Sequence, residues 1–301
     1  MANSFKADQE TIAKIIEYYK YLQDENITSN TSVYFKASCK DFTVLIYSTG
    51  TVLFQGKKAK EELERWTIFD GEQLSFDEEY ENIIDDEVDH IGSDEVGCGD
   101  YFGPIVVTSA YVKKEDYHFL VDIGVKDSKK LNDEKIKELA KIIKEKVKSV
   151  TFVLSNEKYN EIHGNSYNLN KVKAYLHNFV LHKLTSSINF DGKVVIDQFC
   201  EKNTYFNYLK DYKTKEIQEN ITFTTKAESK YIAVACASII ARDRFIEEID
   251  KIKKETGYDI PLGANDHVDE VAKQIMDEKG FEYLSKYIKV HFKNTEKIKQ
   301  M

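Results

Sequence analysis

The chain has 301 residues, enough for two domains, and 42% of them are aliphatic or aromatic, which is sufficient for a hydrophobic core. A mean hydropathy of −0.50 with 32% charged residues is typical of a soluble chain, and no apolar run approaches the roughly 18 residues that a membrane span needs. Because the first ten residues contain no apolar signal region, we expect a cytoplasmic protein without a membrane partner.

The formal net charge of −9 is unevenly distributed. Residues 66–112 hold thirteen Asp and Glu and no Lys or Arg, whereas residues 113–301 carry 34 basic and 30 acidic groups, a net charge of +4. Phosphate contacts depend on local fields, so the overall charge does not exclude a nucleic-acid partner. The four cysteines are scattered and form no Cys-x-x-Cys pair, which argues against a zinc site.

The first 68 residues have the pattern of a small α+β domain. Apolar residues at helical spacing predict an amphipathic helix within residues 8–23, and β-branched and aromatic runs predict strands at 32–37, 42–48 and 51–55. A charged helix is expected at 57–66. Residues 69–89 are dense in acid and lack any period, so we interpret them as an exposed linker before a second domain, 90–301.

The most informative stretch is Ser93-Asp94-Glu95-Val96-Gly97-Cys98-Gly99-Asp100-Tyr101-Phe102-Gly103-Pro104. It predicts a strand, a glycine turn and a second strand that begins near residue 103. Adjacent residues of a strand point to opposite faces, so Asp94 and Glu95 can meet at one ion only if the chain bends there, as Gly97 and Gly99 permit. Such a pair suits Mg²⁺ or Mn²⁺, which prefer oxygen ligands. Taken alone, the pattern also fits the acidic end of a hairpin.

The remaining chain alternates predicted strands and helices. Asn132 is a plausible N-cap of a helix that ends near residue 147. Further strands are expected at 150–154, 193–197 and 221–225, and further helices at 168–184, 228–251, 266–276 and 281–286, followed by a basic tail. Asp197 ends its strand at the carboxyl side, where chemistry usually lies in an α/β sheet. These elements indicate an α/β fold with a mixed sheet covered by helices.

The motif at 93–104 resembles the opening motif of the type 2 ribonucleases H. Its continuation from Gly99 to Pro104 is similar to ribonuclease HIII, and Cys98 stands where ribonuclease HII usually has Arg. Asp-Ser-Lys-Lys-Leu at 127–131 and the segment 290–297 are similar to the same family. The resemblance implies a ribonuclease H fold in the second domain.

The strand-turn-strand at 43–57 is similar to the TATA-box-binding-protein-like module at the N-terminus of ribonuclease HIII. That resemblance implies a sheet whose lysines contact a duplex backbone: Lys36, Lys40, Lys57 and Lys58. The alternative is that these lysines only keep a small sheet soluble.

The resemblance also implies four metal-binding carboxylates, Asp94, Glu95, Asp197 and Glu228. Two divalent ions, Mg²⁺ or Mn²⁺, would stabilise the attacking and leaving oxygens of a phosphodiester. Family members often have Asp where this chain has Glu228. Asp243 is the rival for the fourth position, although we interpret it as a salt-bridge partner.

Substrate contacts are also implied by the resemblance. Backbone groups of Gly97, Cys98 and Gly99 are suited to sensing the ribose 2′-hydroxyl, because glycine lets main chain approach a sugar closely. The basic side chains expected to contact phosphates are Lys129, Lys130, Lys226, Lys230 and Arg242.

The resulting hypothesis is a monomeric endonuclease that cuts the RNA strand of RNA–DNA hybrids and leaves 5′-phosphate and 3′-hydroxyl ends. Two alternatives stay open. One is ribonuclease HII-like cleavage at single ribonucleotides in DNA, and the other is a hybrid-binding protein without turnover.

Overall fold

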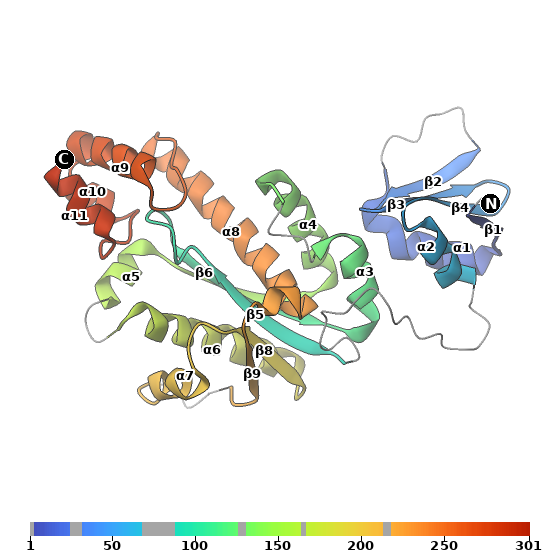
Figure 1. Ribbon diagram of the computed structural model, residues 1–301, viewed down its shortest axis with the longest axis horizontal. Helices are drawn as coiled ribbons and strands as arrows, with labels where there is room; N and C mark the ends of the chain where they lie inside the picture. The colour runs from blue at the N-terminus through green and yellow to red at the C-terminus, as the bar shows by residue number, and fades with distance from the viewer. Residues whose placement is uncertain (1–2, 25–31, 68–87, 126–130, 164–166, 213–217) are drawn as a thin grey trace. The chain divides into compact units, whose positions relative to one another are not determined.

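The computed structural model describes residues 3–24, 32–67, 88–125, 131–163, 167–212 and 218–301 (Figure 1). The chain divides into two compact units, one formed by Met1–Glu81 with His118–Val125 and the other by Asn82–Tyr117 with Lys126–Met301. The predicted linker lies almost entirely outside the described residues, so its placement between the domains stays a prediction.

The first unit is an antiparallel sheet with two helices against one face. Its strands β1 (Ser4–Lys6), β2 (Val33–Ser38), β3 (Phe42–Tyr47) and β4 (Thr51–Gly56) lie in the order β1-β4-β3-β2. Alternate residues of β2, β3 and β4 are buried beneath α1 (Gln9–Tyr19) and α2 (Ala59–Thr67), and a short 3₁₀ turn (Lys20–Leu22) follows α1. The period-2 pattern of the sequence therefore marks the buried face correctly.

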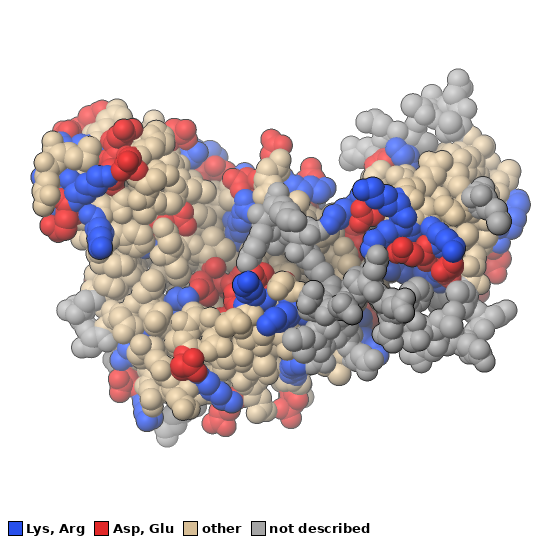
Figure 2. All heavy atoms as spheres, in the orientation of Figure 1, with Lys and Arg blue, Asp and Glu red and all other residues tan. Residues whose placement is uncertain are grey.

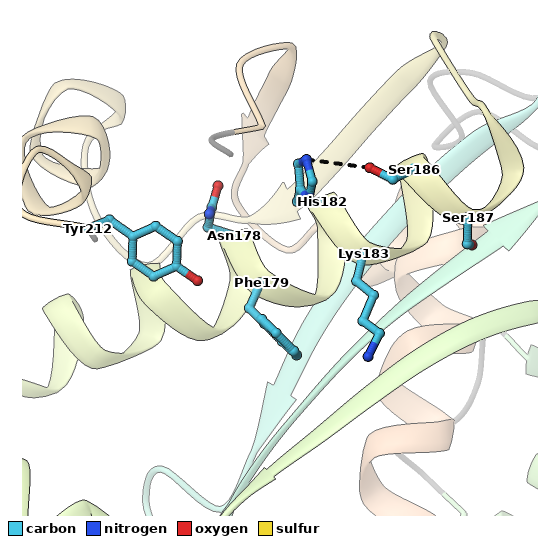
Figure 3. Close-up of a pocket in the computed structure, with 7 residues that line it drawn as sticks. All are labelled: Asn178, Phe179, His182, Lys183, Ser186, Ser187 and Tyr212. Carbon is cyan, nitrogen blue, oxygen red and sulfur yellow. Dashed lines mark hydrogen bonds between the residues drawn. The ribbon is translucent and has the colours of Figure 1, made fainter. Parts of the chain in front are cut away.

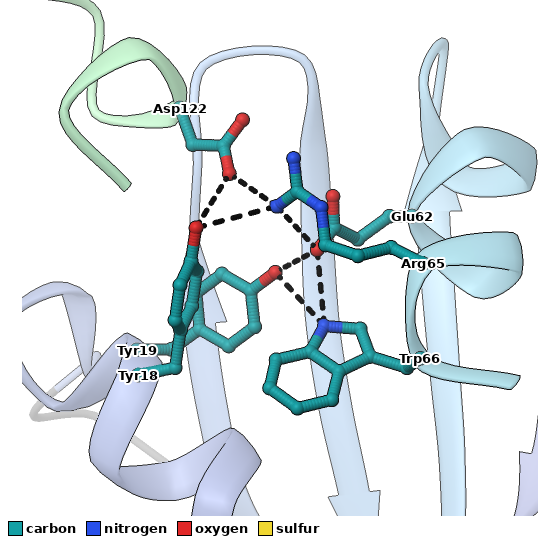
Figure 4. A network of polar contacts seen from close by, with 6 residues as sticks. All are labelled: Tyr18, Tyr19, Glu62, Arg65, Trp66 and Asp122. Carbon is teal, nitrogen blue, oxygen red and sulfur yellow. Dashed lines mark hydrogen bonds and ion pairs between the residues drawn. The ribbon is translucent and has the colours of Figure 1, made fainter. Parts of the chain in front are cut away.

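A buried polar network joins the helices of this unit to helix α3 (Tyr117–Asp122), which lies in the segment around residues 118–125 (Figure 4). Arg65 Nη1 donates to Asp122 Oδ2 at 2.7 Å and to Glu62 Oε1 at 3.0 Å. Trp66 Nε1 donates to the same Glu62 oxygen at 3.0 Å, and Tyr19 Oη is also bonded to it. Burial raises the pKa of Glu62, and the guanidinium of Arg65 opposes that rise.

The second unit contains a five-stranded mixed sheet. Its strands are β5 (His90–Val96), β6 (Ile105–Val112), β7 (Lys148–Leu154), β8 (Lys193–Asp197) and β9 (Ile221–Thr224), in the order β7-β6-β5-β8-β9. The pairs β5–β6 and β6–β7 are antiparallel, whereas β5–β8 and β8–β9 are parallel. The predicted mixed sheet flanked by helices is confirmed, with strand ends within two or three residues of those expected.

Helices cover both faces of this sheet. The long helix α8 (Ile232–Thr256) packs on β5 and β6 with α4 (Asp133–Lys146) beside it, and α6 (Leu169–Ile188) packs on the same strands from the other side with α7 (Lys202–Leu209) next to it. Gly92 explains how closely α8 approaches, because a Cβ there would lie 2.2 Å from the backbone nitrogen of Val234. A row of small residues in α8 serves the same close packing: Ala233, Ala235, Cys236, Ala237, Ser238 and Ala241.

The C-terminal helices form a separate cluster around the chain that follows β5. They are α9 (Asp266–Lys279), α10 (Phe281–Ser285) and α11 (Lys293–Gln300), and they bury Tyr101 and Phe102 together with residues of α8.

Two further short elements of this unit are a 3₁₀ turn (Lys114–Asp116) and α5 (Asn156–Ile162). None of the helices in the described part of the chain is both long and apolar enough to cross a bilayer.

One helix begins at its predicted capping residue, Asn132, and a second N-cap, Asn168, is a finding of the structure. The side chain of Asn132 accepts from the backbone N–H of Lys135 at 2.9 Å, and that of Asn168 from Lys171 at 2.8 Å. One predicted helix begins later than expected. Residues 227–229 form a 3₁₀ turn and α8 starts only at Ile232, because the chain reverses direction through Lys226, whose φ is +55°.

Candidate active site

Asp94 and Asp197 lie next to each other at the carboxyl ends of two adjacent parallel strands. The register pairs Ser93 of β5 with Ile196 of β8, so the following residue of each strand occupies the next level of the sheet. Neighbouring strands are about 4.8 Å apart. Two carboxylates that are more than one hundred residues apart in sequence are therefore brought side by side.

Asp94 faces α8. Its carboxylate accepts a hydrogen bond from the hydroxyl of Ser238, in the second turn of that helix, and another from the backbone N–H of Glu95 at 2.8 Å. Burial raises the pKa of Asp94, and the nearby negative charges of Glu95 and Asp197 raise it further. The site therefore stores electrostatic repulsion that a cation would relieve.

Glu95 faces the opposite side of the sheet, toward α6. His177 Nε2 lies 2.8 Å from Glu95 Oε2, Lys173 Nζ forms an ion pair with Oε1, and Ser93 Oγ is 2.7 Å from His177 Nδ1. Burial alone would raise the pKa of Glu95, but the hydrogen bond and charge of His177 together with Lys173 hold it below its usual value. Glu95 is thus kept ionised by partners that do not reach Asp94.

The expected bend at the acidic pair is displaced. Strand β5 stays paired with β6 through Glu95–Val107 and Val96–Val106, so the two carboxylates leave an extended chain on opposite faces. The chain turns only at Gly97, whose φ is +92°. Asp94 and Glu95 interact electrostatically across the end of the sheet rather than from one side of it.

Asp197 and Glu228 form the other half of the acidic group. Asp197 Oδ1 accepts from the backbone N–H of Ala227 at 3.1 Å, which ties the end of β8 to the 3₁₀ turn that carries Glu228. Burial raises the pKa of Asp197, and the charge and hydrogen bond of Glu228 raise it as well. The four predicted acids are therefore linked in the order Glu95, Asp94, Asp197, Glu228.

The donor set fits a hard divalent cation. All four side chains offer carboxylate oxygens. Burial raises the pKa of Asp94 and of Asp197, and neighbouring acids raise both pKa values further, so a cation at this site would offset burial and repulsion together. As the side chains stand, no three or more His, Cys, Asp or Glu in the described residues converge closely enough to form a complete metal cage. Glu95 explains part of this, because Lys173 and His177 draw its carboxylate toward α6.

The glycine loop, residues 97–103, follows the acidic pair directly. A Cβ at Gly97 would lie 2.2 Å from the carbonyl oxygen of Pro104 and 2.8 Å from the ring of Phe245, so this position is closely enclosed. Gly99 is exposed, and a Cβ there would have no neighbour within 4 Å. Cys98 is half-buried between them, and burial raises the pKa of its thiol to about 12. The loop thus presents open backbone at Gly99 beside the acids.

The predicted basic contacts have different surroundings. Lys129 and Lys130 lie outside the described residues. Lys226 is exposed two residues before Glu228, and Lys230 is half-buried two residues after it. Arg242 Nη2 is paired with Asp133 at 2.8 Å, and the rival acid Asp243 is bonded to Lys144 at 2.6 Å, as expected for a salt-bridge partner.

The lysines proposed for the first unit lie around its sheet. Lys36, on β2, is paired with Asp24 at 2.7 Å, and Lys57 is exposed after β4. The uncovered face of that sheet also exposes Tyr34. The face is therefore mixed in character, with aromatic and hydroxyl groups beside the lysines.

Three residues that contact the acids escaped sequence reasoning. Lys173 and His177 are four residues apart within a stretch of α6 that is otherwise interpreted from its apolar stripe. Residues four apart lie on the same side of a helix, so a lysine and a histidine at this spacing beside an apolar face could have predicted that α6 binds a buried carboxylate. Ser238 carried no such signal, because it lies in a row of small residues that already has a packing role.

Neither the face of the described residues seen in Figure 2 nor the hollow along α6 indicates a second site. Figure 2 shows acidic and basic side chains interspersed over the visible face of the described residues, without a continuous field of one sign. A hollow of about 530 Å³ lies along the outer side of α6 and is lined by Phe179, Lys183 and Tyr212 among others (Figure 3). Its only drawn hydrogen bond joins His182 to Ser186 at 3.4 Å, and none of the four acids lines it.

Comparison with known proteins gives consistent matches over nearly the whole chain. The family model "Ribonuclease HII" matches residues 91–295, and a "Domain of unknown function (DUF3378)" matches residues 4–75. The chain is 39% identical to ribonuclease HIII of Oceanobacillus iheyensis, with 97% of each chain covered, and 40% identical to ribonuclease HIII of Bacillus mycoides, with 87% of each covered. A solved structure described as Bst-RNase HIII in complex with Mn²⁺ superposes with a TM-score of 0.69 and 37% identity, covering 99% of this chain and 97% of that one.

Proposed function

Because the chain belongs to the ribonuclease HII family and, within it, to ribonuclease HIII, we propose that it is an endoribonuclease that hydrolyses the RNA strand of RNA–DNA hybrids with Mg²⁺ or Mn²⁺. Asp94, Glu95, Asp197 and Glu228 hold the ions, and the products carry 5′-phosphate and 3′-hydroxyl ends. The observation that carries the proposal is the side-by-side placement of Asp94 and Asp197 at the ends of β5 and β8.

Each acid has a distinct part in this proposal. Two bound divalent cations would stabilise the charge that develops on the attacking and leaving oxygens of the phosphodiester. Asp94 and Asp197 lie between the other two acids and are suited to bind both ions. Glu228 completes one side from the 3₁₀ turn, and Glu95 would complete the other once an ion competes with Lys173 and His177 for its carboxylate.

The residues around the acids orient these carboxylates before any ion arrives. Ser238 fixes one oxygen of Asp94, and the N–H of Ala227 fixes one oxygen of Asp197. A carboxylate has lone pairs on both oxygens, so each acid accepts its hydrogen bond and keeps capacity for a metal. Pre-orientation of this kind lowers the free-energy cost of assembling the site.

Substrate selection follows from the loop beside the acids. The open backbone at Gly99 permits a sugar to approach within hydrogen-bonding distance, and the ribose 2′-hydroxyl is the group that distinguishes RNA from DNA. Lys226, exposed two residues before Glu228, is proposed to contact a phosphate of the same strand. Lys129 and Lys130 are proposed for phosphates further along the duplex. The first unit, with its exposed Tyr34 and lysines, is proposed to hold the duplex backbone.

Cleavage at isolated ribonucleotides in DNA is the second candidate. The observation against it is Cys98, because a cysteine between the glycines lacks the guanidinium that ribonuclease HII usually has there. A hybrid-binding protein without turnover is disfavoured because all four acids are present and linked.

A cleavage assay tests these assignments. Labelled RNA–DNA hybrid and a DNA duplex with one ribonucleotide are incubated with the protein and Mg²⁺ or Mn²⁺, with and without EDTA. We expect cleavage of the hybrid that EDTA abolishes and little cleavage of the single-ribonucleotide duplex. Preferential cleavage of the latter would favour the second candidate instead.

Substitution of Asp94 tests the site itself. Asp94→Asn keeps the size of the side chain but removes a charge at the centre of the group, so cleavage should be abolished while hybrid binding changes little. Asp191→Asn, at an exposed aspartate just before β8, is the matched control and should leave cleavage unchanged. Cleavage retained in Asp94→Asn would remove Asp94 from the mechanism.

A further inference from the structure

The glycine loop is held from outside by a segment nearly two hundred residues later in the chain. Backbone hydrogen bonds run from Lys289 N–H to Tyr101 O at 2.9 Å and from Gly103 N–H to Tyr287 O at 3.0 Å. Phe102 and Ile288 form an antiparallel β-bridge between them. The segment 287–289 therefore lies along the loop like a short additional strand.

The side chain of Lys289 reaches under the same loop. Its Nζ donates to the carbonyl oxygens of Asp100 at 2.7 Å and of Gly103 at 2.5 Å, and the residue has 0% of its surface exposed. Asn156 Nδ2 also donates to Gly103 O, at 2.9 Å. The sequence predicted only a basic tail from residue 286, so a fully buried lysine here is a finding of the structure.

A lysine is an expensive residue to bury for packing alone. Burial lowers the pKa of Lys289 to about 8, and the groups that receive its hydrogen bonds are backbone carbonyls. An apolar side chain of similar length would fill the same space without the desolvation penalty. The ammonium therefore has a role that depends on its N–H donors.

The loop needs this support because its own sequence favours mobility. It contains three glycines, Gly103 has a φ of +84°, and Gly99 has open space around it. Within the loop, the backbone bond from Asp100 N–H to Gly97 O is long, at 3.3 Å. A second external tie runs from Gly263 N–H to the carboxylate of Asp100 at 2.6 Å.

We propose that Lys289 is a positioning residue that fixes the backbone of the glycine loop in the orientation needed to recognise the ribose of the substrate. The proposal rests on the function proposed above. Lys289 contacts no substrate; it acts through the carbonyls of Asp100 and Gly103, and so through the peptide planes that carry the amides of the loop.

Cys98 provides a built-in reporter for the loop. It lies within the loop and is half-buried, so its alkylation rate measures how often the loop opens. Cys236 is fully buried in α8 and reports global opening instead. Mass spectrometry of both peptides after timed alkylation separates local from global loosening, and it requires neither metal nor turnover.

The central variant is Lys289→Met, which keeps the length and removes the donors. The change removes the Nζ donor of the Asp100 carbonyl and leaves the Gly103 carbonyl with Asn156 alone, so the loop should open more often and alkylation of Cys98 should become about tenfold faster. The rate at Cys236 should not change. In the cleavage assay, KM for the hybrid should rise by about tenfold while kcat changes much less, because the acids stay in place.

Two further variants make the test decisive. Lys293→Met, at an exposed lysine of the adjacent helix, should alter neither alkylation nor kinetics. If Lys289→Met does not fold, Asn156→Ala, which removes the other donor to Gly103, takes its place with a smaller effect in the same direction. Unchanged alkylation of Cys98 in the folded variant, or a fall in kcat with KM unchanged, would overturn the positioning role. Absence of hybrid cleavage by the wild-type protein would instead overturn the proposed function, and the alkylation result would remain interpretable.

Discussion

Substituting alanine for Gly92 tests whether the approach of α8 to β5 sets the geometry of the acids. A Cβ at this position would lie 2.2 Å from Val234 N, 2.5 Å from Ala233 C and 2.7 Å from Val234 Cα, all of them backbone atoms of α8. Ordinary contact begins near 3.4 Å, so the strand and the helix would have to separate by about 1.2 Å. Overpacking of this kind costs about 1–3 kcal/mol, and more where only backbone can move.

The same separation reaches the active site, because Asp94 is two residues beyond Gly92 and bonded to Ser238 on α8. A hydroxyl–carboxylate bond of about 2.7 Å lengthened by about 1.2 Å is no longer a hydrogen bond. Misplacement of a catalytic group by about 1 Å costs on the order of 100-fold in rate. We therefore expect Gly92→Ala to lower both the free energy of unfolding and the rate of hybrid cleavage.

Urea denaturation followed by circular dichroism measures the first effect, and the hybrid-cleavage assay measures the second. Gly99→Ala is the matched control for stability, because its Cβ would meet nothing within 4 Å. It should unfold at the wild-type urea concentration, and any effect should be confined to substrate recognition. A Gly92→Ala protein with wild-type stability and activity would refute the argument.

Two other predictions concern buried polar groups. Arg65→Met should destabilise the first unit by about 3–5 kcal/mol, since Glu62 and Asp122 would keep their charges without the guanidinium between them. The unfolding transition of that unit measures this effect. Lys60→Met, at an exposed ion pair, is the control and should shift that transition little. His90 accepts from Ala233 N–H at 3.3 Å, and burial lowers its pKa, so the unfolded state binds more protons below the ordinary pKa of 6.5. The unfolding free energy should therefore fall as the pH drops below about 6.5. His90→Gln should remove part of that loss, whereas His267→Gln, at an exposed histidine, should not. Identical pH profiles of the unfolding free energy for wild type and His90→Gln would contradict this assignment.

The sequence was a good guide wherever local chemistry decides the structure. Asn132 caps its helix as predicted, because an N-cap needs only its own side chain and the next turn, and the helix expected from residue 168 begins at Leu169. Asp197 ends β8 as predicted, since the apolar run before it has to be buried. The β-branched and aromatic runs likewise predicted β2, β3 and β4 to within a residue at each end.

Features that depend on distant parts of the chain were not predictable in this way. Glu95 lies on the α6 face because adjacent strand residues alternate, but Lys173 and His177, which hold its carboxylate there, come from a helix far along the chain, and no local pattern around residue 95 identifies them. In the sequence, Lys289 belongs to a basic tail. The carbonyl oxygens that accept from its ammonium, those of Asp100 and Gly103, lie nearly two hundred residues earlier in the chain. The late start of α8 follows from the reversal at Lys226, where a non-glycine residue adopts a positive φ.

The parallel pairing of β5 with β8 has a consequence for the newly made protein. Asp94 leaves the ribosome long before Asp197, and the two become neighbours only after β8 has been synthesised and inserted beside β5. Such a long loop closes slowly, which delays the pairing further. A nascent chain therefore cannot bring the four proposed metal-binding acids together until most of the polypeptide has emerged.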